Sequence, residues 1–343
     1  MFFFVLSGFV LSLQFMKPIP PRYLPYLVKR VSRLYIPYAS ALVFAGILKM
    51  SLRAGPVGTE WGIPLTLSVL ADHFLMIGSF SQSALDPVIW SLVNEMRISI
   101  VFPFLVFLIV RLRAALSILF LLICYVTALL LHGFFYTDHF FTNFQDTLSY
   151  ILMFGVGVLL AKYKWALGKV ISQRQRSVRV TTLLFGLLLY TYSATVQYRA
   201  TELYEFLARE HVMNGFFYHL MINWGTFYVE RLICTIGAAT VMIVVISSTS
   251  MAHLLKHSVP LLLGRMSYSL YLFHFPILLG LLTVLPSYTS TGVIWALFIP
   301  LTFCISYLSY RYIERPSTNL GRHLAEKLVS SAKDVKGMPT SAT

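Results

Sequence analysis

Long apolar runs alternate with short polar and basic stretches along almost the whole chain. A helix crosses the roughly 30 Å hydrocarbon core of a bilayer with about 20 residues. Nine runs approach or reach that length: 2–16, 34–52, 88–110, 114–132, 146–161, 180–197, 229–249, 259–283 and 292–312. A tenth run, 63–80, is interrupted by Asp72 and His73. The pattern predicts an all-α polytopic membrane protein with about nine transmembrane helices.

The positions of Lys and Arg predict the orientation of these helices. Basic residues gather in the segments 17–33, 111–113, 162–179, 256–265 and 311–336. Nine crossings place all five segments on one side, which the positive-inside rule assigns to the cytoplasm. A further crossing by 63–80 would move every later segment to the opposite side. We therefore predict that 63–80 does not cross, being re-entrant or interfacial, and that the C-terminus is cytoplasmic.

The composition agrees with a membrane protein. Hydrophobic residues make up 57% of the chain and charged residues 12%, whereas soluble domains carry about 25% charged residues. The net charge of +14 is explained by positive-inside anchoring, so we expect membrane lipids and no nucleic acid as partners. We predict one transmembrane domain over 1–315, a polar, loosely ordered cytoplasmic tail over 316–343, and an outer loop over 198–228.

The start of the chain is unusual for a complete bundle. Nine crossings with a cytoplasmic C-terminus place Met1 on the outer side. The first run is only about 22 Å long at 1.5 Å per helical residue, which is shorter than the hydrocarbon core. An additional helix upstream of Met1 would restore both the length and a cytoplasmic N-terminus, so we expect one.

The span 88–110 contains a buried candidate for chemistry, Glu95. A charged residue at the centre of a membrane helix costs about 2.5–3.5 kcal/mol on insertion scales, and such residues usually have a function. Arg97 follows two residues later, and residues two apart face different directions on a helix. We therefore expect Glu95 and Arg97 to contact different neighbours. Asp86 is a good N-cap and Pro87 a good first residue, which predicts the helix start.

Two further groups lie on predicted helices. Arg30 and Arg33 share a helix face, so their guanidiniums suit a phosphate-bearing ligand; the alternative is anchoring to lipid head groups. Ser267, Tyr271 and His274 have i, i+4, i+7 spacing and form one polar stripe. An intramembrane His is a functional candidate, and the alternative is a core hydrogen bond.

The small pair Ser7 and Gly8 is explained by close packing of another helix. Other features extend along the chain in a recognisable order. They are Phe3-Phe4-x-x-Ser7-Gly8-Phe9, Lys29-Arg30 with Arg33 and Pro37, Trp90-Ser91-Leu92-x-x-Glu95, Phe154-x-x-Gly157, Gly264-x-x-Ser267-Tyr268-x-x-Tyr271-Leu272-x-His274-x-Pro276, and Ile313-Glu314-x-Pro316. In this order they resemble the membrane-bound acyltransferase-3 family, whose members transfer acyl groups, commonly acetyl, to extracytoplasmic glycans. Family members usually begin with one more helix, which carries an Arg and a His proposed as catalytic, and this chain starts after that helix.

The resemblance implies a membrane-bound O-acyltransferase in the inner or plasma membrane. Its donor would be cytoplasmic acyl-CoA, such as acetyl-CoA, without a metal, and its acceptor a hydroxyl of a cell-envelope glycan or lipid-linked glycan. Catalytic candidates are Glu95, His274 and His73, because a proton must leave the acceptor hydroxyl. Arg30 and Arg33 would bind the donor. The substrate path would include Ser7, Trp90, Ser91, Arg97, Ser267, Tyr268, Tyr271 and Glu314.

Two alternatives remain open from the sequence. Intramembrane Glu, Arg and His also occur in substrate paths of transporters, so a transporter or flippase-like protein for lipid-linked sugars fits the same residues. The other alternative is an acyltransferase that is inactive because the Arg and His helix is absent. We expect the chain as it stands to transfer acyl groups poorly, and acyl transfer from labelled acyl-CoA separates an enzyme from a transporter.

Overall fold

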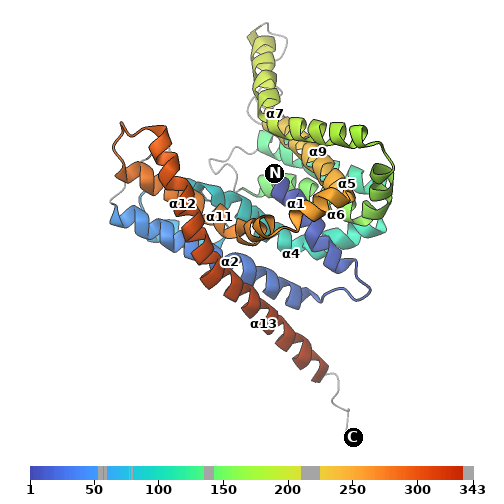
Figure 1. The fold of residues 1–343 in the computed structure, drawn as a ribbon, viewed down its shortest axis with the longest axis horizontal. Coiled ribbons are helices and arrows are strands. Elements are labelled where there is room, and N and C mark those ends of the chain that lie inside the picture. The colour runs from blue at the N-terminus through green and yellow to red at the C-terminus, as the bar shows by residue number, and fades with distance from the viewer. Residues whose placement is uncertain are drawn as a thin grey trace. The chain divides into compact units, whose positions relative to one another are not determined.

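A computed structural model describes residues 1–52, 57, 60–76, 78, 80–134, 143–209 and 225–334. The described residues form helices and turns, without a β-strand. Figure 1 shows the helices in chain order. They are α1 Phe2–Phe15, α2 Tyr23–Ser51, α3 Leu67–Leu75, η1 Gln82–Ala84, η2 Pro87–Ile89, α4 Trp90–Arg111, α5 Ala114–Phe134, α6 Phe144–Ser172, α7 Arg176–Arg209, α9 Thr226–Ser247, α10 Thr249–Leu255, α11 Ser258–Val284, α12 Thr291–Ser309, η4 Tyr310–Glu314 and α13 Arg315–Asp334.

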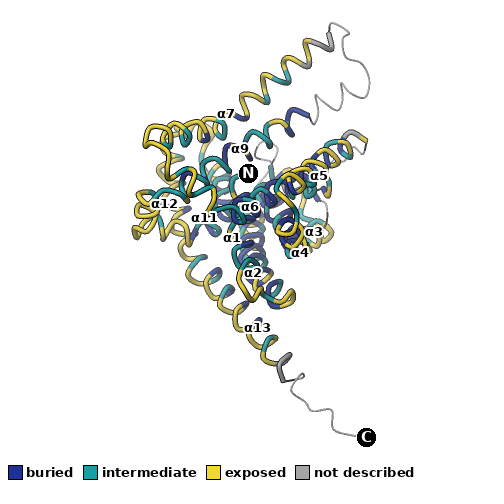
Figure 2. The backbone as a smooth tube through the Cα atoms, turned by 90° about the vertical axis from the view of Figure 1, so that its right-hand side faces the viewer, coloured by how far each residue is buried: buried dark blue, intermediate teal, exposed yellow. Residues whose placement is uncertain are grey.

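The predicted all-α polytopic membrane class is confirmed. Within the described part of the chain, eight helices are long and apolar enough to cross a membrane, and α1 is a shorter apolar helix. Together they coincide with the nine predicted apolar runs. Figure 2 shows that α7 and α12 are largely exposed, as expected for apolar helices that face lipid.

Two predictions about the connecting segments need correction. Helix α7 continues to Arg209, so the first part of the expected outer loop 198–228 is helical, while 210–224 lies outside the described residues. The tail is also helical, because α13 extends from Arg315 to Asp334 and packs on α2. Ser317, Gly321 and Ala325 are buried, and their i, i+4, i+8 spacing forms the face of small residues that contacts α2.

In the part of segment 63–80 that the structure describes, α3 is the only helix. Its nine residues extend about 14 Å, which is too short to cross a bilayer. The Thr66 hydroxyl accepts a hydrogen bond from the Val69 N–H at 3.3 Å and caps the start of the helix. Met76 has a left-handed backbone, with φ of 55°, and ends it. The segment therefore lacks a spanning helix, as predicted, and its place at the outer interface stays a prediction.

The predicted start of the next span is confirmed at Asp86. Its carboxyl accepts a hydrogen bond from the Val88 N–H at 3.3 Å, and Pro87 is the first residue of η2. Burial raises the pKa of the Asp86 carboxyl well above its ordinary value. The same region is tied to α2 by Lys49, whose ammonium donates to the carbonyl oxygens of Ile63 at 2.6 Å and Ala84 at 3.0 Å.

The described residues form two compact units, one of residues 1–20 and 101–257 and one of 21–100 and 258–343. In the first unit, α1 packs closely on α6. A Cβ on Gly8 would lie 2.1 Å from the Phe154 carbonyl oxygen, and a Cβ on Gly157 would lie 2.2 Å from the Val5 carbonyl oxygen. The packing explanation of Gly8 is therefore correct, and Gly157 is its counterpart on the facing helix.

In the second unit, α2, α3, α11 and the start of α4 share an apolar core. Its buried members include Leu34, Tyr38, Leu42, Leu92, Met96, Leu272 and Phe273. This core holds the helices that carry the polar residues of the candidate site.

The α1–α6 contact yields a stability prediction. Gly157→Ala places a methyl group against the backbone of α1, so we expect destabilisation by about 1–3 kcal/mol or more. The measurement is the thermal unfolding midpoint of the purified protein in detergent. Gly292→Ala is the control, because nothing lies within 4 Å of a Cβ at Gly292. Equal midpoints for both variants would contradict the close approach of α1 and α6.

Candidate active site

The second unit contains an ion pair between two predicted membrane spans. The Arg30 guanidinium of α2 donates to the Glu95 carboxylate of α4. Its Nε also donates to the Ser99 hydroxyl at 3.0 Å, and the Tyr26 hydroxyl donates to the Ser99 carbonyl oxygen at 3.1 Å. The side chains of Arg30 and Glu95 are only 8% and 16% exposed. Each buried charge therefore supplies the counter-ion that the other needs.

Arg97 contacts a different neighbour, as predicted. Its Nη2 donates to the Gly78 carbonyl oxygen at 2.7 Å. Since Glu95 and Arg97 are two positions apart, their side chains leave the helix in different directions. Glu95 faces α2, and Arg97 holds the segment that precedes α4.

The two donor-binding candidates on α2 diverge. Arg30 is buried against Glu95, whereas Arg33 is exposed and lines an open cavity. Residues three apart on a helix differ by about 60° in direction, which is enough to send them to different neighbours. The Arg30 guanidinium is paired with Glu95 in this arrangement, and the binding of one ligand by both arginines stays a prediction.

Two tyrosine hydroxyls of α11 donate to carbonyl oxygens of neighbouring elements. The Tyr268 hydroxyl donates to the Leu34 carbonyl oxygen at 2.7 Å. The Tyr271 hydroxyl donates to the Val88 carbonyl oxygen at 2.6 Å and lies 2.7 Å from the Ser91 hydroxyl. The hydroxyls of Tyr271 and Ser91 therefore lie together, whereas Tyr268 bonds to α2, and the role of all three as path residues stays a prediction.

The order of these contacts along the helices shows that Glu95 and His274, two of the catalytic candidates, lie at different levels. On α2 the residue numbers rise as those on α4 fall, since Tyr26 meets Ser99 and Arg30 meets Glu95. Tyr271 contacts Ser91, one turn before Glu95, and His274 lies on the far side of Tyr271. Helix rise therefore separates Glu95 from His274 by about 10 Å along the helices.

His274 and Ser267 bond to their own helix. His274 Nδ1 lies 2.8 Å from the Tyr271 carbonyl oxygen and 3.2 Å from that of Leu270. The Ser267 hydroxyl donates to the Gly264 carbonyl oxygen at 3.0 Å. The predicted stripe is therefore not one connected network, because only Tyr271 bonds across to η2 and α4. With Nδ1 donating, Nε2 is the basic nitrogen of His274.

His73 belongs to the packing of α3. It is 1% exposed, and its Nδ1 lies 2.7 Å from the Val69 carbonyl oxygen of the same helix. Its ring lies 4.6 Å from that of Phe80, and its carbonyl oxygen accepts from the Tyr38 hydroxyl at 2.7 Å. These contacts fasten α3 to α2.

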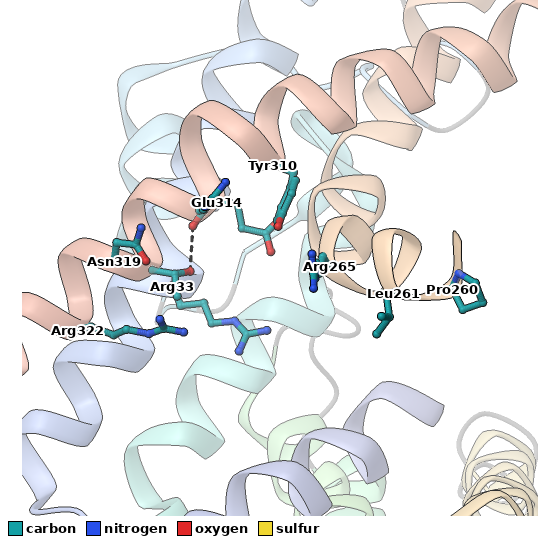
Figure 3. Close-up of a pocket in the computed structure, with 11 residues that line it drawn as sticks. Arg33, Pro260, Leu261, Arg265, Tyr310, Glu314, Asn319 and Arg322 are labelled. Carbon is teal, nitrogen blue, oxygen red and sulfur yellow. Dashed lines mark hydrogen bonds between the residues drawn. The ribbon is translucent and has the colours of Figure 1, made fainter. Parts of the chain in front are cut away.

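A cavity of about 570 Å³ lies between α2, α11, η4 and α13. Figure 3 shows Arg33, Arg265 and Arg322 reaching it from three helices. It is lined by Arg33, Pro260, Leu261, Gly264, Arg265, Tyr310, Glu314, Arg315, Thr318, Asn319 and Arg322. The lining contains four arginines and one acidic residue, Glu314, whose carboxylate accepts from the Ser269 hydroxyl at 2.6 Å. The cavity therefore has the charge of an anion-binding site.

Two other predicted path residues, Trp90 and Ser7, do not line this cavity. Trp90 is the first residue of α4, and its carbonyl oxygen accepts from the Asn94 amide at 2.7 Å. Ser7 lies on α1 in the first unit, beside the closely packed Gly8. Within the described residues, no group of three or more His, Cys, Asp or Glu is placed to hold a metal ion.

Sequence reasoning missed several polar residues. Arg265, Arg315 and Arg322 were interpreted only as cytoplasmic anchors, and Ser269 was not singled out. The first unit also holds a buried ion pair, in which Arg231 Nη1 lies 2.6 Å from Asp146 Oδ1. A charged Arg231 inside an apolar run is the same signal that identified Glu95.

The Arg30–Glu95 pair can be tested by mutation. Arg30→Met leaves the Glu95 carboxylate buried without its counter-ion, so we expect a loss of about 3–5 kcal/mol in unfolding free energy. The double variant Arg30→Met/Glu95→Met should recover most of that loss. Thermal unfolding in detergent measures both, with the exposed Arg33→Met as control. A single variant that is as stable as wild type would contradict the pair.

Comparison with known proteins finds relatives of this chain by sequence. The chain is similar to the O-acetyltransferase OatA of Staphylococcus aureus, in strains NCTC 8325 / PS 47 and COL, with 25% identity over 252 residues. The match covers 71% of this chain and 38% of each relative, so the chain spans well under half the length of these curated relatives. No solved structure gives a significant match.

The family model covers nearly the whole helical bundle. The model of the acyltransferase-3 family, described as an acyltransferase domain, matches residues 1–311. This range contains α1 to α12 and all the motifs that carry the resemblance except Ile313-Glu314-x-Pro316, which lies beyond it. The chain therefore belongs to the acyltransferase-3 family of integral membrane acyltransferases.

Proposed function

We propose that this protein transfers an acetyl group from acetyl-CoA, bound at the arginine-lined cavity, to a hydroxyl of a cell-envelope glycan. The observation that carries the proposal is the position of this cavity. Arg33 of the cavity lies one helical turn from Arg30, which holds Glu95 in the membrane core. The donor site and a candidate reaction centre thus adjoin the same turn of α2.

The donor assignment depends on charge and access. CoA is a polyanion, and guanidiniums form bidentate contacts with phosphate. Arg33, Arg265, Arg315 and Arg322 are exposed and leave the cavity open to a soluble cofactor. These four arginines belong to the basic segments 17–33, 256–265 and 311–336, which the positive-inside rule assigns to the cytoplasm. A donor that approaches from the cytoplasm and a cytoplasmic C-terminus are consistent with this orientation, and we propose that the protein lies in the plasma membrane.

The chemistry requires a group that accepts a proton. The acceptor oxygen attacks the thioester carbonyl carbon, the carbon–sulfur bond breaks, and the hydroxyl proton passes to a base. The leaving sulfur is released as a thiolate and takes up the proton from the base, so that CoA departs as a free thiol and the base is regenerated. We assign the base to Glu95, because its carboxylate lies against Arg30 of α2, one helical turn from the cavity residue Arg33. A general base contributes about 10²–10⁴-fold to such a step.

We assign the hydroxyls of Tyr268, Tyr271 and Ser91 to binding of the acceptor glycan. Tyr268, Tyr271 and Ser91 extend from the level of Glu95 toward the predicted outer end of α4. Their polar groups would accompany a sugar hydroxyl through an apolar bundle. The relatives are O-acetyltransferases by name, which supports transfer of acetyl to oxygen. A glycan or lipid-linked glycan would then approach from the extracytoplasmic side.

Glu95→Gln tests the base. It keeps the shape of the side chain and removes its basicity, so we expect at least a 10²-fold loss of acetyl transfer with donor affinity retained. Transfer of labelled acetyl from acetyl-CoA to envelope glycans, with the protein in native membranes, is the measurement. His274→Gln is the matched control and should retain most activity. Full activity in Glu95→Gln together with loss in His274→Gln would move the base to His274.

Arg33→Lys tests the donor site. Lysine keeps the charge but loses the planar fork, so we expect the KM for acetyl-CoA to rise by about tenfold while kcat changes little. Steady-state kinetics over a range of acetyl-CoA concentrations measures this. Arg174→Lys, at an exposed arginine away from the cavity, should leave KM unchanged. An unchanged KM in Arg33→Lys would leave Arg33 as an anchor for lipid head groups.

A further inference from the structure

Five of the eleven residues that line the arginine-lined cavity lie outside the matched family domain. The family match ends at residue 311, whereas Arg315, Thr318, Asn319 and Arg322 all line the cavity from α13. Figure 3 shows Arg322 and Asn319 on this helix beside Arg33 of α2. The tail that composition alone predicted to be loosely ordered therefore contributes to the candidate donor site.

Helix α13 is held in place at two points. Gly321, next to Arg322, packs so tightly on α2 that a Cβ would lie 2.8 Å from the Ser32 Cβ and 3.3 Å from the Lys29 Cα. At the start of the helix, the hydroxyls of Ser317 and Thr318 donate to the Glu314 carbonyl oxygen at 2.8 and 2.9 Å. These contacts fix α13 relative to both α2 and η4, and they position Arg322.

The four guanidiniums fall into two pairs by origin. Arg33 and Arg265 belong to the family domain, and Arg33 is one turn from the ion pair at Glu95. Arg322 lies two turns of α13 beyond Glu314, next to Gly321, which packs against Lys29 and Ser32 of α2. CoA also carries two separate phosphate groups. The diphosphate adjoins the pantetheine arm, and the 3′-phosphate of the ribose lies at the end farthest from the thioester.

The two pairs of arginines can be matched to the two phosphate groups of CoA. We propose that α13 completes the donor site and that Arg322, supported by Arg315, binds the 3′-phosphate of CoA, while Arg33 and Arg265 bind the diphosphate. This assignment rests on the proposed use of acyl-CoA. It makes the tail helix the element that distinguishes a 3′-phosphorylated donor from one that lacks this group. Bidentate guanidinium–phosphate contacts give such discrimination its strength.

The test compares acetyl-CoA with acetyl-3′-dephospho-CoA in the full chain. We expect wild type to prefer acetyl-CoA by at least tenfold in kcat/KM, and Arg322→Gln to reduce this preference to about one to threefold. Arg33→Lys should weaken both donors similarly and retain the preference. Lys327→Gln, an exposed charge on the same helix that does not line the cavity, should behave as wild type.

A second variant separates charge from position. Gly321→Val keeps every arginine but pushes α13 away from Ser32, so it should also reduce the preference. Retention of the full preference in Arg322→Gln or in Gly321→Val would overturn the assignment. If wild type uses acetyl-CoA while Arg322→Gln keeps the preference, this inference alone fails. If wild type uses neither donor, the proposed function itself fails.

Discussion

The pairing of Arg30 with Glu95 is the constraint on which the rest of the site depends. Either charge alone would be costly in an apolar span, and together they fix how α2 faces α4. The neighbouring contact of Tyr26 with Ser99 keeps the same antiparallel register. Once Arg30 is directed at α4, the helix geometry sends Arg33 to another side. One turn of α2 thereby joins a buried charge pair to an open anion cavity.

Small residues control the helix contacts that position these groups. Lipid tails are as apolar as leucine, so the hydrophobic effect contributes little to association between membrane helices. Close backbone approach takes its place, as at Gly8 and Gly157 in the first unit and at Gly321 in the second. At Gly321 this approach also has a consequence for chemistry. The next residue is Arg322, so the packing of α13 sets where a guanidinium stands in the cavity.

Local features were predictable from the sequence. The apolar runs, the cap at Asp86, the close approach at Gly8 and the divergence of Glu95 from Arg97 each depend on neighbours a few positions away. The partner of Glu95 lies 65 positions away on α2, and no spacing rule identifies it. Hydroxyls and imidazoles can also bond to their own helix, which is why Ser267 and His274 do not join Tyr271 in a network. The roles of Glu95, His274 and His73 remain predictions.

The sequence analysis predicted a loosely ordered tail and missed the cavity arginines for the same reason, because both depend on contacts between distant helices. Polar composition suggested a loosely ordered tail, but Ser317, Gly321 and Ala325 form a contact face that outweighs it. Arginines near span ends were interpreted by the positive-inside rule, which explains orientation and says nothing about convergence. Only the packing of α2, α11 and α13 shows that Arg33, Arg265 and Arg322 share one cavity.

The most direct test of this account is cryo-electron microscopy of the protein with CoA bound. The account predicts phosphate density between Arg33, Arg265 and Arg322, with the pantetheine arm entering the bundle toward Glu95. Phosphate density at a different surface, with this cavity empty at saturating CoA, would contradict the claim that one turn of α2 joins the donor site to the reaction centre.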